Sequence, residues 1–194
     1  MVKMHLYLRS TDIIDWETPS VREHAGGLAG SVSDSMEIAR ICFEWVRDNI
    51  SHSGDAAASV TTCRASEVLE NKTGWCFAKS HFLAALLRAS GIPTGFCYQR
   101  LRRDDGKGFS LHGLNAVCLP DIGWYRIDAR GNKPGVDAQF CPPDERLAFY
   151  PKEEGEFDFP EIWPDPVGLV VECLMKNSGW ETVRENLPDI GVGR

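Results

Sequence analysis

The sequence lacks the features of several protein classes. No stretch approaches the ~20 apolar residues of a membrane span, and the N-terminus has no apolar run typical of a signal peptide. Internal repeats and low-complexity tracts are absent too. With 21 Lys and Arg against 28 Asp and Glu, the net charge of -7 provides no broad basic surface. We therefore expect a cytoplasmic protein with no nucleic-acid or membrane partner, and the oligomeric state stays open.

Paired cysteines are missing as well. The chain has seven Cys, an odd number, and no two have the C-x-x-C spacing of zinc ligands or dithiol redox pairs. We expect reduced thiols that are mostly buried as small hydrophobic side chains. The sequence predicts no metal and no organic cofactor.

The bulk composition is that of one ordinary globular domain. A chain of 194 residues with 43% hydrophobic and 25% charged residues can bury a core without disulfides. We expect a single domain over 1–194, with its motifs in a core of about 33–132 and an irregular and helical extension over 133–194.

Two helices are well marked by their periodicity and their ends. Asp34 is the expected N-cap of a helix that ends near Asn49 and has one apolar face. A second helix, over 74–90, is apolar nearly all round, which predicts a central position. Thr73 is its expected N-cap, and Gly91 is the residue expected to end it.

The other expected elements follow from shorter patterns. In chain order they are an edge strand at 4–8, a helix within 12–30, a turn at 51–55, a helix at 65–69, strands at 95–101, 111–119 and 124–130, a helix at 167–175 with Asp165 as N-cap, and a helix at 181–186. Helices followed by sequential strands predict an α+β domain.

Three polar residues stand where acyl-transfer chemistry would need them. Cys76 lies at the start of the apolar helix, His112 in the second expected strand and Asp128 in the third. A thiol, a histidine and a carboxylate together form an activated cysteine nucleophile. A helix N-terminus and an imidazolium both favour the thiolate form of a cysteine.

The connection between the two strands decides whether His112 and Asp128 meet. A two-residue loop would place them on opposite faces of the sheet. A three-residue loop at 120–122, or a bulge near Gly123, places them on one face and one diagonal step apart. We therefore predict an irregular connection.

An oxyanion would need two donors. The backbone N–H of Cys76 is one of the unpaired donors of the first helical turn and is the first candidate. The sequence leaves the second donor open among Trp75, Gln99 and Asn115.

At these residues the chain resembles the transglutaminase-like superfamily of papain-fold Cys-His-Asp proteins. The matching segments are 45–50 (WVRDNI), 74–76 (GWC), 88–93 (RASGIP), 111–117 (LHGLNAV) and 123–128 (GWYRID). The likeness is to small bacterial stand-alone members. No acidic calcium loop and no zinc cysteines of the related peptide N-glycanases are seen.

The resemblance implies a papain-like fold and a division of roles. Cys76 would be the nucleophile, His112 the general base and then acid, and Asp128 the group that orients the imidazole. The implied reaction is attack on a peptide or Gln carboxamide, with transfer of the acyl group to water or to an amine acceptor. Two alternatives stay open: a silent peptide-binding scaffold, and an arylamine-type acetyltransferase.

Other polar residues have simpler interpretations. His81 is expected in the core, and His5, His24 and His52 on the surface. The basic group at 100–107 is expected to be a solvated loop that could rim a cleft, and the Pro142-Pro143 pair with the segment 157–163 is a candidate for a lid.

Overall fold

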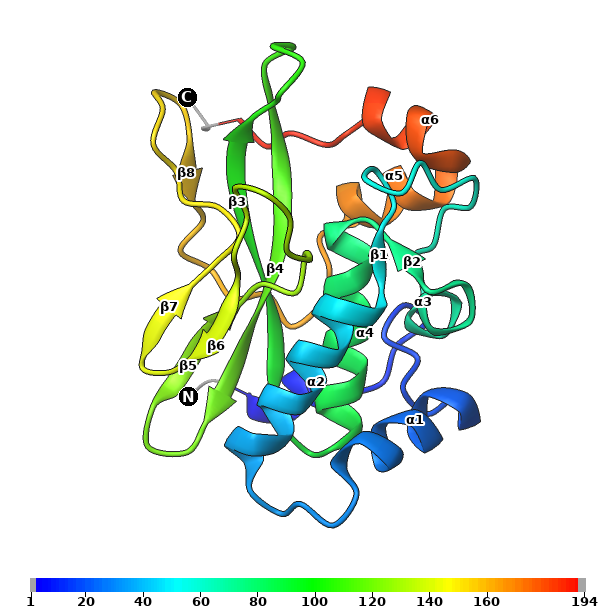
Figure 1. Ribbon diagram of the computed structural model, residues 1–194, viewed down its shortest axis with the longest axis vertical. Helices are drawn as coiled ribbons and strands as arrows, with labels where there is room; N and C mark the ends of the chain where they lie inside the picture. The colour runs from blue at the N-terminus through cyan, green and yellow to red at the C-terminus, as the bar shows by residue number, and fades with distance from the viewer. Residues whose placement is uncertain (1–2, 192–194) are drawn as a thin grey trace.

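The computed structural model describes residues 3–191 and contains one four-stranded antiparallel sheet beside a group of helices (Figure 1). The strand order is β5-β4-β3-β8. The strands are β3 (Thr94–Arg102), β4 (Phe109–Leu119), β5 (Gly123–Ile127) and β8 (Phe157–Asp158). The mixed helix and sheet content agrees with the predicted α+β, papain-like class.

The helices are α1 (Pro19–Ala29), α2 (Ser35–Asn49), α3 (Ala65–Asn71), α4 (Cys76–Ala89), α5 (Gly168–Lys176) and α6 (Gly179–Glu185), preceded by a 3₁₀ helix at Met4–Tyr7. Two small ribbons complete the fold: parallel β1 (Ser51–His52) with β2 (Thr73–Gly74), and antiparallel β6 (Gln139–Cys141) with β7 (Asp144–Arg146). Among residues 3–191, no helix is long and apolar enough to cross a membrane.

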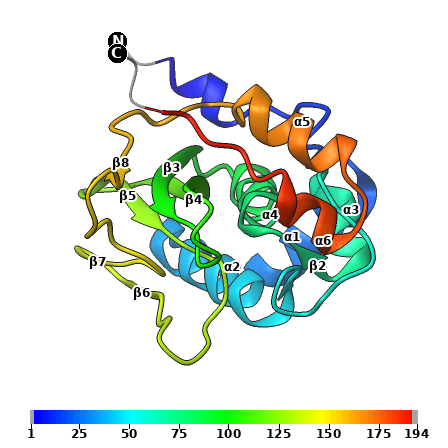
Figure 2. The ribbon, with the colours of Figure 1, turned by 90° about the horizontal axis from the view of Figure 1, so that it is seen from above.

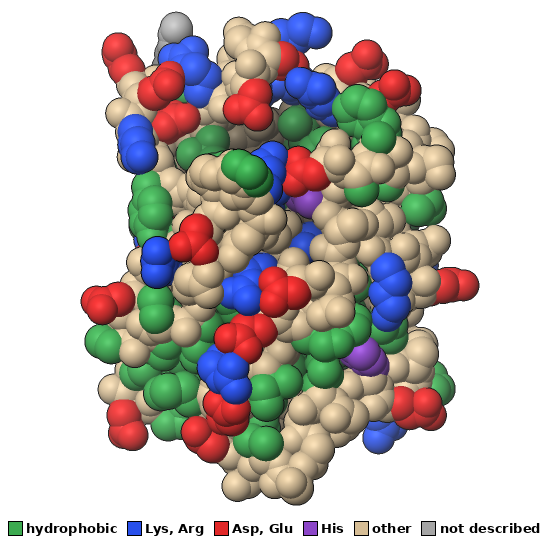
Figure 3. Space-filling model, viewed as in Figure 1, with side chains coloured by type: hydrophobic (Ala, Val, Ile, Leu, Met, Phe, Trp, Pro, Cys, Tyr) green, Lys and Arg blue, Asp and Glu red, His purple; other side chains and the backbone are tan. Residues whose placement is uncertain are grey.

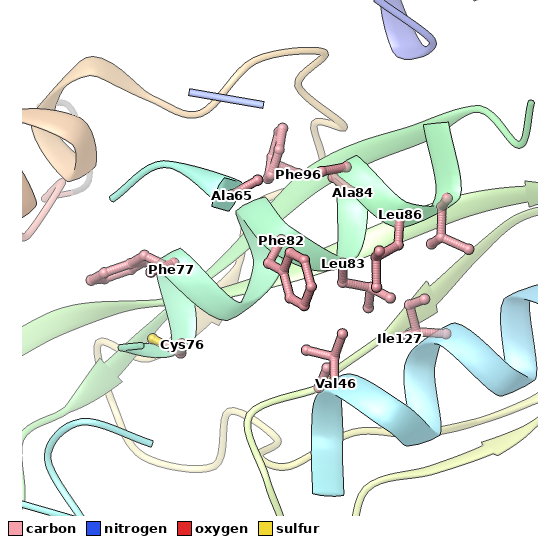
Figure 4. Packing of buried hydrophobic residues seen from close by; sticks show 14 of the residues in the cluster. Val46, Ala65, Cys76, Phe77, Phe82, Leu83, Ala84, Leu86, Phe96 and Ile127 are labelled. Carbon is pink, nitrogen blue, oxygen red and sulfur yellow. The ribbon is translucent and has the colours of Figure 1, made fainter. Parts of the chain in front are cut away.

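Helix α4 is the centre of the molecule. It packs against β4 and against α1, α2 and α3, and Figure 2 shows it enclosed between the sheet and the other helices. Every residue from Cys76 to Arg88 is buried. Figure 4 shows Val46 of α2 pointing toward Phe82 and Leu83, with Cys76 at the N-terminal end of the helix. The predicted central position of this helix is confirmed.

The connection between β4 and β5 is the irregular one that the triad requires. Leu119 pairs with Gly123, so residues 120–122 form a three-residue loop. Asp121 and Gly123 both adopt positive φ angles, 61° and 80°. Glycine reaches this region without a steric penalty, which favours a tight turn at Gly123. This prediction is confirmed.

Two predictions at the start of elements are wrong. Residues 4–7 form the 3₁₀ helix instead of a strand, and Tyr7 donates a hydrogen bond from its hydroxyl to Ile162 O at 2.8 Å. Thr73 does not cap α4, because it lies in β2 and its hydroxyl contacts Ser53 Oγ at 3.2 Å. Trp75 occupies the N-cap position and has no side-chain cap bond.

The C-terminal part also differs from expectation. Helix α5 starts at Gly168 with Val167 at the N-cap position, and the expected cap Asp165 forms an ion pair with Arg9 instead. The segment 157–163 is no lid: β8 pairs with Gln99 and Arg100, so the segment extends the sheet along β3.

Candidate active site

Cys76 is held at the N-terminus of α4 by the β1–β2 ribbon. β2 pairs with β1 two residues before the cysteine, and the chain turns directly into the helix. A Cβ on Gly74 would lie 3.1 Å from Ala78 Cβ, so the glycine allows this tight entry. The Cys76 side chain lines a cleft, although the residue is only 7% exposed.

His112 and Asp128 meet where β5 ends. β5 pairs with β4 only between Asn115 and Leu119, so the part of β4 that contains His112 has a free edge on that side. Asp128 lies one residue beyond the last residue of β5, not within the strand as predicted. Its Oδ2 accepts a hydrogen bond from His112 Nε2 at 2.8 Å.

Asp128 is buried but fully hydrogen-bonded. Its Oδ2 also accepts from the backbone N–H of Ala148, and its Oδ1 accepts from that of Arg130, each at 3.1 Å. Burial by itself would raise the pKa of Asp128, but the His112 imidazolium and these two N–H groups lower it. The carboxyl group is therefore ionised at neutral pH.

His112 carries the positive charge that is paired with the Asp128 carboxylate. Burial by itself would lower its pKa, but the Asp128 carboxylate and the Cys76 sulfur raise the pKa of His112 to about 10. The Cys76 side chain is thus close enough to the ring to contribute to that rise. Since Nε2 faces Asp128, the Nδ1 atom is the ring nitrogen left for the thiol. The ring also contacts Phe149 edge-on, with centroids 5.0 Å apart.

A glycine lets the helix and the strand approach each other. A Cβ on Gly113 would lie 2.7 Å from Phe77 Cδ1 and 3.4 Å from Phe77 Cα. Any larger residue would push α4 away from β4 at the level of Cys76 and His112. The juxtaposition therefore depends on Gly113 as well as on the polar residues themselves.

The three candidates for the second oxyanion donor differ clearly in the structure. Both amide hydrogens of Gln99 are used, on Phe149 O and Asp158 Oδ1. The amide hydrogens of Asn115 are donated to Ser80 O in α4 and to Gly95 O in β3, and the first of these bonds links α4 to the sheet. Neither residue has a free amide hydrogen, so the structure does not favour either as the second donor. Trp75 lines the cleft, and its Nε1 is buried without a partner.

The cleft over Cys76 has a volume of about 980 Å³. Half of its lining residues belong to 133–187, so the C-terminal part supplies much of its wall. Arg102 and Arg103 lie on its rim and are paired with Glu153 and Asp105, as expected of a basic loop that rims a cleft. Figure 3 shows acidic and basic side chains next to one another around a recess in which a histidine is visible.

Two of the histidines expected on the surface, His52 and His24, are not fully exposed. His52 lines the cleft, and its ring lies edge-on to Trp75 with centroids 5.2 Å apart. His24 packs against Trp45, 4.2 Å between centroids. His81 is in the core as predicted, with its Nδ1 2.7 Å from Cys63 O. No periodicity could reveal His52, because its position depends on the parallel pairing of β1 with β2.

The cysteines follow the prediction with one exception. Cys141 is exposed, whereas five of the seven are buried and Cys118 is half-buried. In the part of the chain that the structure describes, no three His, Cys, Asp or Glu side chains group as metal ligands.

Comparison with known proteins identifies the family. Residues 22–129, more than half of the chain, match the core domain of the transglutaminase-like superfamily. The chain belongs to this superfamily. The matched range includes all three of Cys76, His112 and Asp128, as well as all five segments that suggested the resemblance.

Two solved structures align with the chain at low identity. A candidate cysteine protease from Cytophaga hutchinsonii aligns with a TM-score of 0.55 and 15% identity, over 67% of this chain and 43% of that one. The periplasmic domain of TgpA from Pseudomonas aeruginosa aligns with a TM-score of 0.47 and 17% identity, over 63% of this chain and 45% of the other. The chain thus spans less than half the length of either. No curated protein matches the sequence.

Proposed function

We propose that this transglutaminase-like protein is a thiol-dependent enzyme that transfers acyl groups through a Cys76-His112-Asp128 triad. The observation that carries the proposal is the buried pair of His112 and Asp128, 2.8 Å apart, with Cys76 as the other partner of the imidazole. A charged pair taken out of water is costly unless it is well hydrogen-bonded, and a purely structural site has little need of one.

The proposed cycle has two halves. The Cys76 thiolate attacks the carbonyl carbon of a peptide or amide, and a C–S bond forms. The C–N bond then breaks, and the amine leaves with the proton of the His112 imidazolium. In the second half a nucleophile attacks the thioester and gives its proton to His112. The C–S bond breaks and the thiolate–imidazolium pair returns.

Two donors are available for the oxyanion in both halves. The Cys76 N–H is at the N-terminus of α4, where the helix offers no internal acceptor. Trp75 Nε1 is a buried donor without a partner beside it, and a substrate oxyanion would satisfy it. This is the role that we assign to Trp75.

We propose that water is the usual acceptor, which makes the enzyme a hydrolase of peptide or amide bonds. An amine acceptor would give transglutaminase-type transfer by the same steps. Incubation of the protein with a casein substrate and a fluorescent primary amine distinguishes the two, because hydrolysis yields new peptides from peptide bonds or ammonia from Gln carboxamides, and transfer yields labelled casein.

The triad is tested by alkylation with iodoacetamide between pH 5 and 9, with each modified cysteine located by peptide mapping. Exposed Cys141 provides a reference thiol in the same molecule. We expect Cys76 to react about tenfold faster than Cys141 at pH 6, and His112→Ala to remove that advantage. If Cys76 reacts no faster than Cys141 at pH 6, the triad does not activate the thiol, and the silent peptide-binding scaffold becomes the better interpretation.

A further inference from the structure

One wall of the cleft beside Cys76 has more positive than negative charge. Arg130 donates from both terminal nitrogens to Asp55, at 2.6 and 3.1 Å, and Lys133 Nζ donates to the same carboxylate at 2.8 Å. Two cations thus share one anion. The three residues, together with His52, line the cleft and are called the basic subsite below.

Residues of this wall contact the triad residue Asp128 and the neighbour of the nucleophile Cys76. The backbone N–H of Arg130 binds the Asp128 carboxylate, so this cation follows the triad by two residues. His52 is the β1 partner of Gly74, and its ring contacts Trp75, the neighbour of Cys76. A ligand group held at this wall would therefore lie next to the reacting carbonyl.

His52 is a buried polar side chain with unused hydrogen-bonding capacity. Its side chain is 9% exposed, and Nδ1 is buried without a hydrogen-bond partner, 3.8 Å from Asp55 Oδ2. Burial and then the Arg130 charge lower the pKa of His52 well below its usual range, so the ring is neutral at pH 7. A neutral imidazole has one N–H donor, which a ligand anion could use.

The balance of charged residues over the whole cleft also favours an anionic ligand. The chain has a net charge of -7. The cleft lining nevertheless holds seven Lys and Arg and only six Asp and Glu. The cleft therefore lacks the acidic excess of the chain as a whole, so an anionic substrate meets less repulsion there than over the rest of the surface.

We propose that the basic subsite binds a carboxylate of the acyl donor, with Arg130 and Lys133 together supplying one positive charge in excess of Asp55, and His52 a hydrogen bond. This inference deepens the proposed function and rests on it. The carboxylate is either an acidic side chain near the scissile bond or the free C-terminus of a peptide, because both present the same group.

The first test compares two alkylating probes that differ only in charge. Iodoacetate has a carboxylate and iodoacetamide is neutral, so the ratio of their rates at Cys76, divided by the same ratio at Cys141, measures attraction of an anion. We expect this normalised ratio to exceed one, and Lys133→Gln to lower it about two- to tenfold, as loss of one charge near the thiol requires. Lys133→Glu should lower it further.

A matched control separates the subsite from charge in general. Lys152 also lines the cleft and has no ion-pair partner among the described residues, so Lys152→Gln removes the same charge at another place. The proposal is overturned if Lys133→Gln leaves the normalised ratio within the error of the wild type, or if Lys152→Gln changes it equally. Because every accessible thiol reacts with both probes, the ratio can be measured even if Cys76 is not activated, so the two hypotheses fail independently.

The second test identifies the source of the carboxylate by protection of Cys76 from iodoacetamide. Three short peptides are compared: one with Glu and an amidated C-terminus, one without Glu and with a free C-terminus, and one neutral at both places. Stronger protection by the first indicates an acidic side chain, and by the second a terminal carboxylate. Equal protection by all three, or by none, contradicts the subsite.

Discussion

His112 and Asp128 show how burial and pairing act against each other on single residues. Each would be neutral if buried alone, and each keeps its charge because the other lies 2.8 Å away. The pair is therefore a source of pH-dependent stability as well as the basis of the proposed chemistry.

The sign of that dependence follows from the direction of the His112 shift. The pKa of His112 is raised to about 10 in the folded protein, from ~6.5 in the unfolded chain. Its charge thus stabilises the fold fully below pH ~6.5, and this contribution is lost as the pH rises toward 10.

We predict that His112→Gln costs on the order of 3 kcal/mol more free energy of unfolding at pH 6 than at pH 10, because glutamine keeps a donor but not the charge. Urea unfolding of both proteins at the two pH values measures this difference. An equal cost at pH 6 and pH 10 would show that His112 is not charged in the folded state.

At the scale of elements, the distance between α4 and β4 is set by single residues at their contact. Asn115 links the strand to Ser80 O of the helix, and Gly113 leaves room for Phe77. One residue thus attaches the two elements, and the other sets how closely they approach.

We predict that Gly113→Ala lowers the free energy of unfolding by about 1–3 kcal/mol, because its Cβ would overlap with Phe77. It should also slow alkylation of Cys76, since α4 has to move away from His112. Gly26→Ala in α1 is the control: nothing lies within 4 Å of its Cβ, and helix propensity predicts a gain of about 0.5–1 kcal/mol. Urea unfolding that finds both variants equally stable would argue against the close approach.

At the scale of the molecule, Arg88 joins three distant segments. The side chain is buried and donates to Thr94 O at 2.8 and 3.1 Å, to Arg9 O at 2.9 Å and to Pro164 O. It thereby connects the C-terminal end of α4 to the start of β3, to the N-terminal segment and to the segment before α5. This arginine belongs to the RASGIP motif at 88–93, and its role here is architectural.

We predict that Arg88→Met lowers the free energy of unfolding by about 3 kcal/mol or more, because three backbone carbonyls lose their donor in the interior. Arg22→Met on the exposed side of α1 is the matched control, with an effect within about 0.5 kcal/mol. Both are measured by thermal or urea unfolding, and an Arg88→Met effect as small as that of the control would contradict the architectural role.

Local patterns in the sequence determined the elements at the centre of the site. The all-round apolar character of α4 predicted its burial. The parity of strand pairing, given that His112 and Asp128 meet, predicted a three-residue loop or a bulge near Gly123, and the structure has the loop. The burial of α4 and the form of this connection each depend on residues close together in the sequence. The local pattern of residues was therefore enough to predict them. The boundaries of α5 and the 3₁₀ helix at 4–7 were not predictable in this way, since contacts with remote segments decided them.

Only the tertiary structure decided which polar groups are free and which are engaged. Gln99 and Asn115 use their donors on remote partners, whereas Trp75 keeps its own. The same holds for the basic subsite, in which Arg130 and Lys133 bind a carboxylate more than 70 residues away in the chain. Hydrogen bonds and ion pairs of this kind join segments with no common periodicity, so their physical basis lies in packing and not in any local pattern.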